Sequence, residues 1–385
     1  MAEIFQFSAV TVIAFVFVIG LVIVIHELGH LYAGRMCGVH AEVFSFGFGP
    51  TLFAVRDRKG TIWRVAALPL GGYVKFLGDA NAASAPDQEA LTKLRAEIGP
   101  DADRCFHFKP IWQRAFITAA GPIANFILAL IIFIAMAMAF GERGNVPVVA
   151  NVRADSPAAT AGFEPGDRVV SVDGRPVRMF SEITEALVFR PGEPVDFVVE
   201  RDGENIELTA AAQMVVFEDR YGGERQYPIV GLESVPEMVS FRYTPLEAVG
   251  AGASQVWGLV EGTGQYVWRI VTLRASPEML SGPAGILTVT GQVANSSLEQ
   301  GVGKLLVDLV RLAGILSIGL GLVNLLPIPI LDGGHLVYYA YEAVARRPMS
   351  AKMQEIGFRV GLALVLGMML VATWNDLNYA RTVFF

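Results

Sequence analysis

Charged residues are scarce in this sequence. They make up 17% of its 385 residues, whereas 53% are hydrophobic, and a soluble domain usually carries about 25% charged residues. The formal net charge is −7, and no run of lysine and arginine offers a surface that could neutralise phosphates, so we expect no nucleic-acid partner. The composition instead predicts a protein whose surroundings are a lipid bilayer.

Cysteine is also rare. Cys37 and Cys105 are the two cysteines, and they are too few for a disulfide framework. Basic residues are missing at the N-terminus, because no Lys or Arg precedes Arg35 and no small-residue cleavage site follows the first apolar stretch. A cleaved secretory signal would have both features. We therefore expect the first apolar stretch to remain as a membrane anchor.

Four apolar stretches are candidates for crossing the bilayer, which takes about 20 residues of helix for a hydrocarbon core of about 30 Å. They cover residues 4–25, 115–140, 312–331 and 360–375. The last is the shortest, and a buried helix of a soluble domain is its alternative. Lys and Arg gather between the first and second stretches and between the third and fourth. This distribution predicts that both loops face the cytoplasm and that residues 141–304 lie outside.

The sequence His26-Glu27-Leu28-Gly29-His30 ends the first apolar stretch. Residues four apart share one face of a helix, so His26 and His30 can bind one Zn²⁺ ion while Glu27 stands beside it. Glu27 can then take a proton from an attacking water and pass one to the leaving amine. A chance match is the alternative, but ionisable groups beside an apolar helix are costly in lipid unless they serve a function.

A catalytic zinc ion usually has a third protein ligand. The metzincin pattern is excluded, because Ala33 and Met36 occupy the positions that it gives to Gly and His. Asp332 follows the third apolar stretch, on the same side of the membrane as His30 by the distribution of basic residues. From the residues alone, Asp332 could equally be a turn residue before two glycines, and His335 is a competing ligand.

These motifs together resemble the site-2 protease family of intramembrane zinc metalloproteases, in its bacterial regulator-of-sigma-E protease branch. The resemblance rests on residues 26–30 and 324–334 and extends over residues 46–50, 69–75, 121–126 and 281–286. It implies that Asp332 is the third zinc ligand and that Asn324 binds the substrate backbone or the developing oxyanion. An interhelical hydrogen bond is the alternative role for Asn324.

The resemblance further implies regulated intramembrane proteolysis in the bacterial inner membrane. The expected substrates are single-span membrane proteins such as anti-sigma factors. The active site would lie toward the cytoplasm. The alternative is a non-enzymatic scaffold or zinc-handling protein, but such a protein has no use for a base at Glu27.

The polar segments between the apolar stretches predict β-structure. Residues 43–48, 52–55, 62–67 and 73–76 are typical of short strands, with 57–60 as a hairpin turn, and in the family such a sheet dips into the membrane beside the zinc. Residues 161–167 resemble a turn of PDZ domains. A helix is predicted over 181–189 with Ser181 as its N-cap. An amphipathic helix is predicted over 244–273, either near the outer surface or packed against the PDZ domain.

The predicted fold is thus a polytopic α-helical membrane protein with about four transmembrane helices, a membrane-associated β-sheet segment and one extracytoplasmic β-rich PDZ domain. We divide the chain into 1–35 (first transmembrane helix with the zinc motif), 36–110 (cytoplasmic-side or re-entrant β region), 111–140 (second helix), 143–213 (PDZ domain), 214–306 (extracytoplasmic segment with the amphipathic helix), 307–335 (third helix with the third zinc ligand) and 354–377 (fourth helix).

Overall fold

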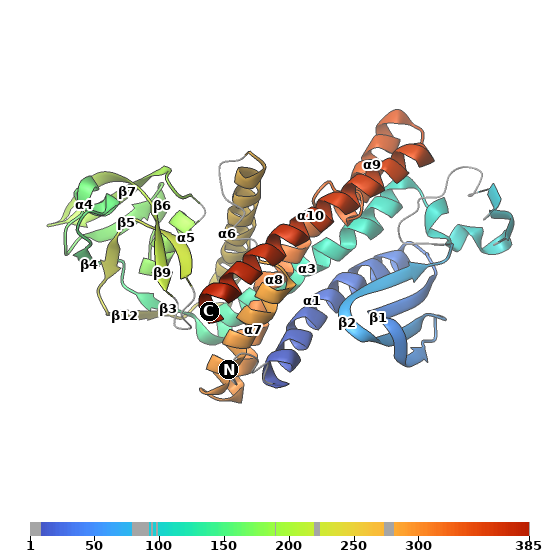
Figure 1. Ribbon diagram of the computed structural model, residues 1–385, viewed down its shortest axis with the longest axis horizontal. Coiled ribbons are helices and arrows are strands. Elements are labelled where there is room, and N and C mark those ends of the chain that lie inside the picture. Colours follow the sequence, from blue (N-terminus) through green and yellow to red (C-terminus); the bar gives the residue numbers. More distant parts are fainter. Residues whose placement is uncertain are drawn as a thin grey trace. The chain divides into compact units, whose positions relative to one another are not determined.

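The computed structural model describes residues 9–78, 92–93, 95–97, 99–188, 190–218, 224–272 and 281–384. Two compact units can be separated in the chain. The first contains the described residues of Met1–Phe133, Gly252–Val260 and Pro277–Asn375, and the second contains those of Ile134–Ala251, Glu261–Ser276 and Asp376–Phe385. Most of the long helices belong to the first unit and most of the strands to the second (Figure 1).

Among the described residues, four helices are long and apolar enough to cross a membrane. They are α1 (Ala9–Met36), α3 (Ile111–Phe140), α8 (Val302–Asn324) and α10 (Ala351–Phe384). The predicted number of spans is therefore confirmed. The first predicted residues of the first stretch, 4–8, lie outside the described part of the chain. The fourth helix is longer at both ends than the predicted 360–375.

The predicted third helix, residues 307–335, is divided differently in the structure. Helix α8 begins earlier, at Val302, and ends at Asn324. Pro327 and Pro329 follow, and proline both lacks an N–H for the helix ladder and disfavours helical backbone at the residue before it. A separate helix, α9 (Asp332–Ala345), begins after this loop. Asp332 is therefore the first residue of a new helix rather than the end of a span.

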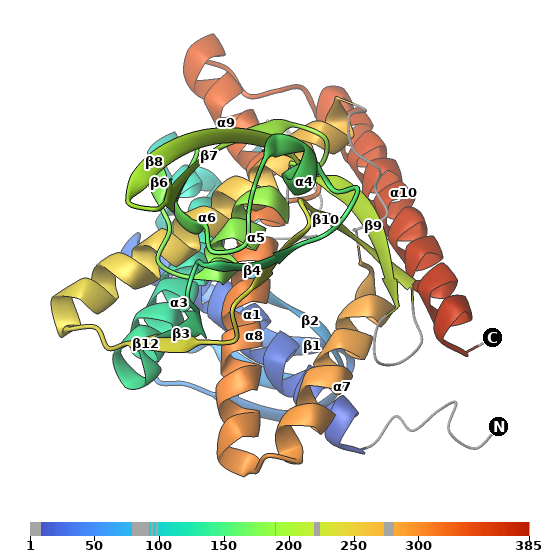
Figure 2. The same cartoon turned by 90° about the vertical axis from the view of Figure 1, so that its left-hand side faces the viewer.

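Helix α1 packs against α8 and against α7 (Pro283–Leu298), which the sequence analysis did not predict (Figure 2). Small and medium apolar side chains interdigitate at this contact, and the buried ones are Ala14, Val18, Val22, Ala294, Leu309 and Ala313. Helix α3 has one exposed apolar face, with Ile123, Ile127 and Ile131 46%, 51% and 59% exposed. Such a face suits contact with lipid, because the bilayer offers an apolar surface of its own.

Strands β1 (Ala41–Arg56) and β2 (Ile62–Phe76) form an antiparallel hairpin beside α1 (Figure 1). The four short strands predicted here are confirmed by the pairing, because residues 43–46 pair with both 62–65 and 72–75, and residues 53–56 pair with 62–65. Gly47, Gly49 and Gly71 have positive φ and lie between these paired segments, where the chain changes direction. The predicted turn at 57–60 is confirmed, and the short 3-10 helices η1 (Gly99–Arg104) and η2 (Phe106–Phe108) precede α3.

The second unit is built around a four-stranded sheet in the order β6-β5-β7-β8. Its strands are β5 (Arg168–Val172), β6 (Arg175–Pro176), β7 (Pro194–Arg201) and β8 (Glu204–Ala211). Helices α4 (Pro157–Ala161) and α5 (Phe180–Val188) accompany it. Buried apolar residues from the sheet and both helices form one core, which includes Val169, Phe197, Ala158 and Ile183.

This unit extends past the boundary that we predicted at residue 213. The further strands are β3 (Glu142–Asn145), β4 (Val149–Val152), β9 (Gln213–Glu218), β10 (Glu224–Ile229), β11 (Leu232–Ser234) and β12 (Met238–Phe241). β11 pairs with β4 and β12 with β3, while Val230 joins the core, so these later strands complete the same domain.

The prediction of Ser181 as an N-cap is wrong, because helix α5 already includes Phe180. Residue 189 lies outside the described residues.

Helix α6 (Pro245–Val271) agrees with the helix predicted over 244–273, although the last predicted residue, 273, is not described. Thr244 caps it in a capping box with Glu247. Two ion pairs join its later turns to the β-rich unit, Glu261 with Arg175 at 3.1 Å and Arg269 with Glu193 at 2.6 Å. These contacts favour the alternative in which the helix packs against that domain.

Candidate metal centre

The two histidines of the motif lie one turn apart on α1, where the helix continues to Met36. Both side chains face α3, which approaches closely because glycine stands at the contact. A Cβ at Gly29 would overlap the Ala120 carbonyl, and one at Gly121 would overlap the rings of His30 and His26. The small residues let the backbones of two helices come together. The His side chains thus fill the space between α1 and α3.

Asp332 reaches the same place from the other end of the sequence. The loop after α8 turns back through a hydrogen bond from the Leu331 N–H to the Ile328 carbonyl, 2.8 Å long. Gly333 and Gly334 follow, and a Cβ at Gly334 would overlap the Ile328 carbonyl. The two glycines therefore let the first turn of α9 lie directly against its own loop, and Asp332 is aimed at α1.

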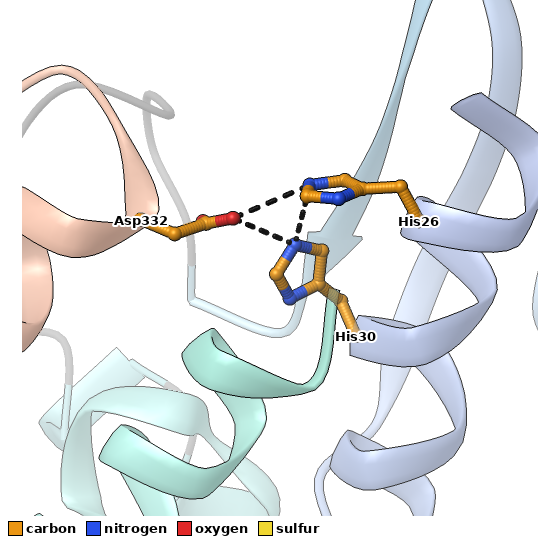
Figure 3. A group of neighbouring side chains, drawn as sticks. All are labelled: His26, His30 and Asp332. Carbon is orange, nitrogen blue, oxygen red and sulfur yellow. Dashed lines mark hydrogen bonds and ion pairs between the residues drawn. The ribbon is translucent and has the colours of Figure 1, made fainter. Parts of the chain in front are cut away.

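The side chains of His26, His30 and Asp332 converge on one point (Figure 3). His26 Nε2 lies 3.2 Å from His30 Nε2 and 3.3 Å from Asp332 Oδ2, and His30 Nε2 lies 3.5 Å from the same oxygen. A tetrahedral zinc ion with ligands at about 2.0–2.1 Å holds its donor atoms about 3.3 Å apart. The three atoms therefore have the spacing of one face of a zinc tetrahedron.

Asp332 Oδ2 gives a second indication that these residues fit a metal ion. It is buried and accepts no hydrogen bond in the described structure, and its polar neighbours are the two imidazole nitrogens. A buried acceptor without a donor is costly, and a cation satisfies it. Among the residues that the structure describes, no other group of His, Cys, Asp and Glu gathers in this way, and His335 is not part of this one.

The His30 ring is held in an orientation that would suit metal binding. His30 Nδ1 lies 2.9 Å from the main-chain carbonyl of Ile117 on α3. The Nδ1–H donates to that oxygen, so Nε2 is the ring nitrogen that is directed at His26 and Asp332. Metal-binding histidines usually have such a partner on their second nitrogen.

Glu27 is covered by strand β2. A Cβ at Gly72 would lie 3.1 Å from Glu27 Cγ, and the Val74 N–H interacts with the Glu27 carboxylate. Asn324, at the last position of α8, has its Nδ2 3.4 Å from His26 Nε2. All of the site residues proposed from the sequence therefore meet in one place.

Asp57 fixes the hairpin to α1 through contacts that were not predicted from the sequence. Asp57 accepts hydrogen bonds from the Arg35 guanidinium, from Trp63 Nε1 at 3.0 Å and from the Thr61 N–H at 3.0 Å. Burial alone would raise the pKa of Asp57, but hydrogen bonds from Trp63 and Arg35 outweigh it and hold that pKa well below its usual range. The charged carboxylate ties the turn of the hairpin to the end of α1.

Comparison with known proteins gives a match over nearly the whole chain. The family model described as peptidase family M50 matches residues 14–368. Metalloprotease MmpA of Caulobacter vibrioides is 46% identical over 380 residues, which cover 96% of each chain. An Agrobacterium fabrum protein named as a zinc metalloprotease, Atu1380, is 40% identical over 95% of each chain. The regulator of sigma-W protease RasP of Bacillus subtilis is 28% identical over 96% of this chain and 98% of its own.

A solved PDZ domain of an SdrC-like protein from Listeria monocytogenes also matches. It is 22% identical, and the match covers 24% of this chain and 87% of that one with a TM-score of 0.19. This similarity is too low to decide the fold of the β-rich unit.

Proposed function

The chain belongs to peptidase family M50, and we propose that its substrates are the transmembrane segments of single-span membrane proteins. The enzyme itself is an intramembrane zinc metalloprotease, as the family match and the names of its relatives establish. The observation that carries the substrate proposal is the position of the metal-ligand group, which joins α1 to the first residue of α9, just after α8 and its loop. Both helices are long and apolar enough to span, so a substrate that is itself in the membrane is best placed to reach the site.

We assign His26, His30 and Asp332 as the ligands of the zinc ion. Their spacing and the orphaned Asp332 oxygen support the assignment. A bound zinc ion would polarise the scissile carbonyl and acidify the attacking water. Three protein ligands leave one position open for reaction, as in other catalytic zinc sites.

Glu27 is assigned as the general base. Its carboxylate takes a proton from the attacking water and later delivers one to the nitrogen of the leaving amine. Asn324 is assigned to the substrate, where its Nδ2 donates a hydrogen bond to the backbone carbonyl as negative charge develops on the oxygen. The 3.4 Å separation of Asn324 Nδ2 from His26 Nε2 supports a place at the reacting bond.

The hairpin supplies the surface that holds the substrate in an extended conformation. Among the described strands, β2 pairs with β1 alone, and its backbone at Gly72 and Val74 lies against Glu27. A strand edge can bind an unwound segment through main-chain hydrogen bonds without demanding one sequence. Edge pairing would place the scissile bond beside the base.

The distribution of basic residues supports a site toward the cytoplasm and a β-rich PDZ domain outside a bacterial inner membrane. The similarity to the regulator of sigma-W protease RasP supports substrates of the anti-sigma-factor kind. We propose that another protease first removes the outer domain of the substrate, and that the PDZ domain either excludes the untrimmed form or binds the new chain end. The non-enzymatic scaffold has no support, because family membership makes the protein a protease.

The test uses the full chain in liposomes with one single-span substrate, supplied intact or without its outer domain. We expect cuts within or beside the transmembrane segment, faster for the trimmed form, and no cuts by Glu27→Gln. Equal cleavage of soluble unfolded peptides would contradict the substrate class. For sidedness, Arg347→Cys and Glu207→Cys are compared in a Cys37→Ser background in intact cells. An impermeant thiol reagent should label only the cysteine at 207, and labelling of 347 alone would reverse the proposed orientation.

A further inference from the structure

Asn125 is a fully buried polar residue in the middle of α3, with 0% of its surface exposed. Its amide nitrogen lies 3.4 Å from His26 Nδ1, and its amide oxygen has no hydrogen-bond partner among the described residues. An unpaired amide in a span is costly, because lipid offers it no hydrogen bond. Such a residue needs a reason other than packing.

The placement of Asn125 repeats that of Ile117. Ile117, Gly121 and Asn125 are four residues apart, so they follow one face of α3, and they lie against His30 and His26 on α1. Ile117 provides a carbonyl for His30 Nδ1, and Gly121 leaves room for both rings. Asn125 occupies the equivalent place for His26.

The chemistry of a histidine ligand decides what His26 needs there. If His26 binds zinc through Nε2, its remaining proton is on Nδ1, and that N–H requires an acceptor. The Asn125 amide lies against Nδ1, with its nitrogen 3.4 Å away, and of the two ends of that amide the oxygen is the one that can accept from Nδ1–H.

We propose that Asn125 is the positioning residue of His26 and that its amide oxygen faces Nδ1 when Nε2 binds zinc. The amide oxygen then accepts from His26 Nδ1–H, as the Ile117 carbonyl does from His30. One end of the amide lacks a protein partner in either orientation, so the contact with His26 decides between them. The proposal rests on the assignment of His26 as a zinc ligand.

Interhelical adhesion does not explain the side chain. The neighbouring helix α8 bonds to Asn125 through the Ser317 hydroxyl, which donates to the main-chain carbonyl at 2.9 Å and leaves the amide untouched. Ser317 therefore offers a matched control. It is buried at the same depth, and its removal breaks the interhelical bond but not the contact with His26.

The experiment measures the zinc affinity of the purified full chain in detergent by competition with a chelator, together with the Tm of the metal-free protein. We expect Asn125→Leu to weaken zinc binding about 10- to 100-fold, the usual effect of losing such a partner. The Tm of the metal-free variant should not fall, because leucine has a similar shape and replaces a buried amide whose oxygen has no hydrogen-bond partner. Asn125→Asp keeps an acceptor and should stay within about threefold of wild type, as should Ser317→Ala.

Wild-type zinc affinity in Asn125→Leu would overturn the proposal, and so would equal losses in Asn125→Asp and Asn125→Leu. If the leucine variant does not fold, Asn125→Ala replaces it in the same comparison. The variant Asp332→Ala separates this proposal from the assigned function. Zinc binding that depends on Asp332 but not on the Asn125 side chain contradicts the positioning role alone, whereas binding that ignores Asp332 contradicts the metal site itself.

Discussion

Replacing Gly121 by alanine separates helix stability from the geometry of the metal site. In an ordinary helix interior this change stabilises by about 0.5–1 kcal/mol, because glycine loses more backbone freedom on folding. Here the new Cβ would overlap His30 Nε2 and lie 2.6 Å from His30 Cε1 and 2.8 Å from His26 Cε1. Ordinary contact begins at 3.4 Å, so both rings must retreat by roughly 1 Å or less.

A displacement of about 1 Å at a catalytic centre can cost about 100-fold in rate. We therefore expect Gly121→Ala to lower kcat/KM about 100-fold and to weaken zinc binding, while the Tm of the metal-free protein stays level or rises. Gly319→Ala in α8 is the matched control, because its Cβ would meet nothing within 4 Å. Cleavage assays, chelator competition and thermal unfolding give the three readings. Wild-type activity in Gly121→Ala would refute the reasoning.

Further predictions concern three carboxylates. Asp332→Ala should abolish stoichiometric zinc binding, measured by metal analysis after gel filtration, because one of three ligands is lost; retained zinc would contradict the ligand set. Asp57→Ala should raise KM while zinc affinity stays within about threefold, because it frees the hairpin from Arg35 without touching the ligands; a loss of zinc would show that the hairpin supports the metal site instead. Burial alone would raise the pKa of Asp167, but hydrogen bonds from Arg201 outweigh it and lower that pKa. The stabilisation is therefore present above the unfolded pKa of about 3.9 and lost as pH falls below it, and Asp167→Asn should flatten the fall in Tm between pH 5 and pH 3.

The part of the site that follows from local spacing could be predicted from the sequence. His26 and His30 share a helix face whenever residues 26–30 are helical. The apolar stretch before them predicts a helix, because a single segment in lipid can satisfy its backbone hydrogen bonds only as a helix. Predicting Asp332 as a metal ligand also required the orientation of the spans and a family resemblance, because a lone Asp before two glycines equally fits a turn.

Contacts between helices could not be predicted. Asn125 and Gly121 matter because α3 lies against the histidines, and their sequence alone carries no sign of that neighbour. Helix α7 was missed because Gly, Ser, Thr and Val are frequent in it, and all of them have low helix propensity. Packing against α1 and α8 overrides that propensity.

The pairing of the strand segments in the hairpin could not be predicted from the sequence either. Gly47, Gly49 and Gly71 have positive φ and interrupt the alternation of apolar and polar residues, so the sequence is typical of several short strands. In the structure these short segments pair separately within β1 and β2: residues 43–46 lie between 62–65 and 72–75, and residues 53–56 pair with 62–65. The pairing that holds them is non-local, and a single-sequence pattern does not contain it.

We propose that Glu27 moves the proton in a zinc site formed by His26, His30 and Asp332. Wild type and Glu27→Gln should therefore be compared in liposomes, with cleavage of a single-span substrate and zinc content measured on the same samples. We expect the variant to keep its zinc and lose cleavage, because glutamine preserves the shape but cannot accept the proton. Cleavage by the variant at the wild-type rate would show that Glu27 is not the base.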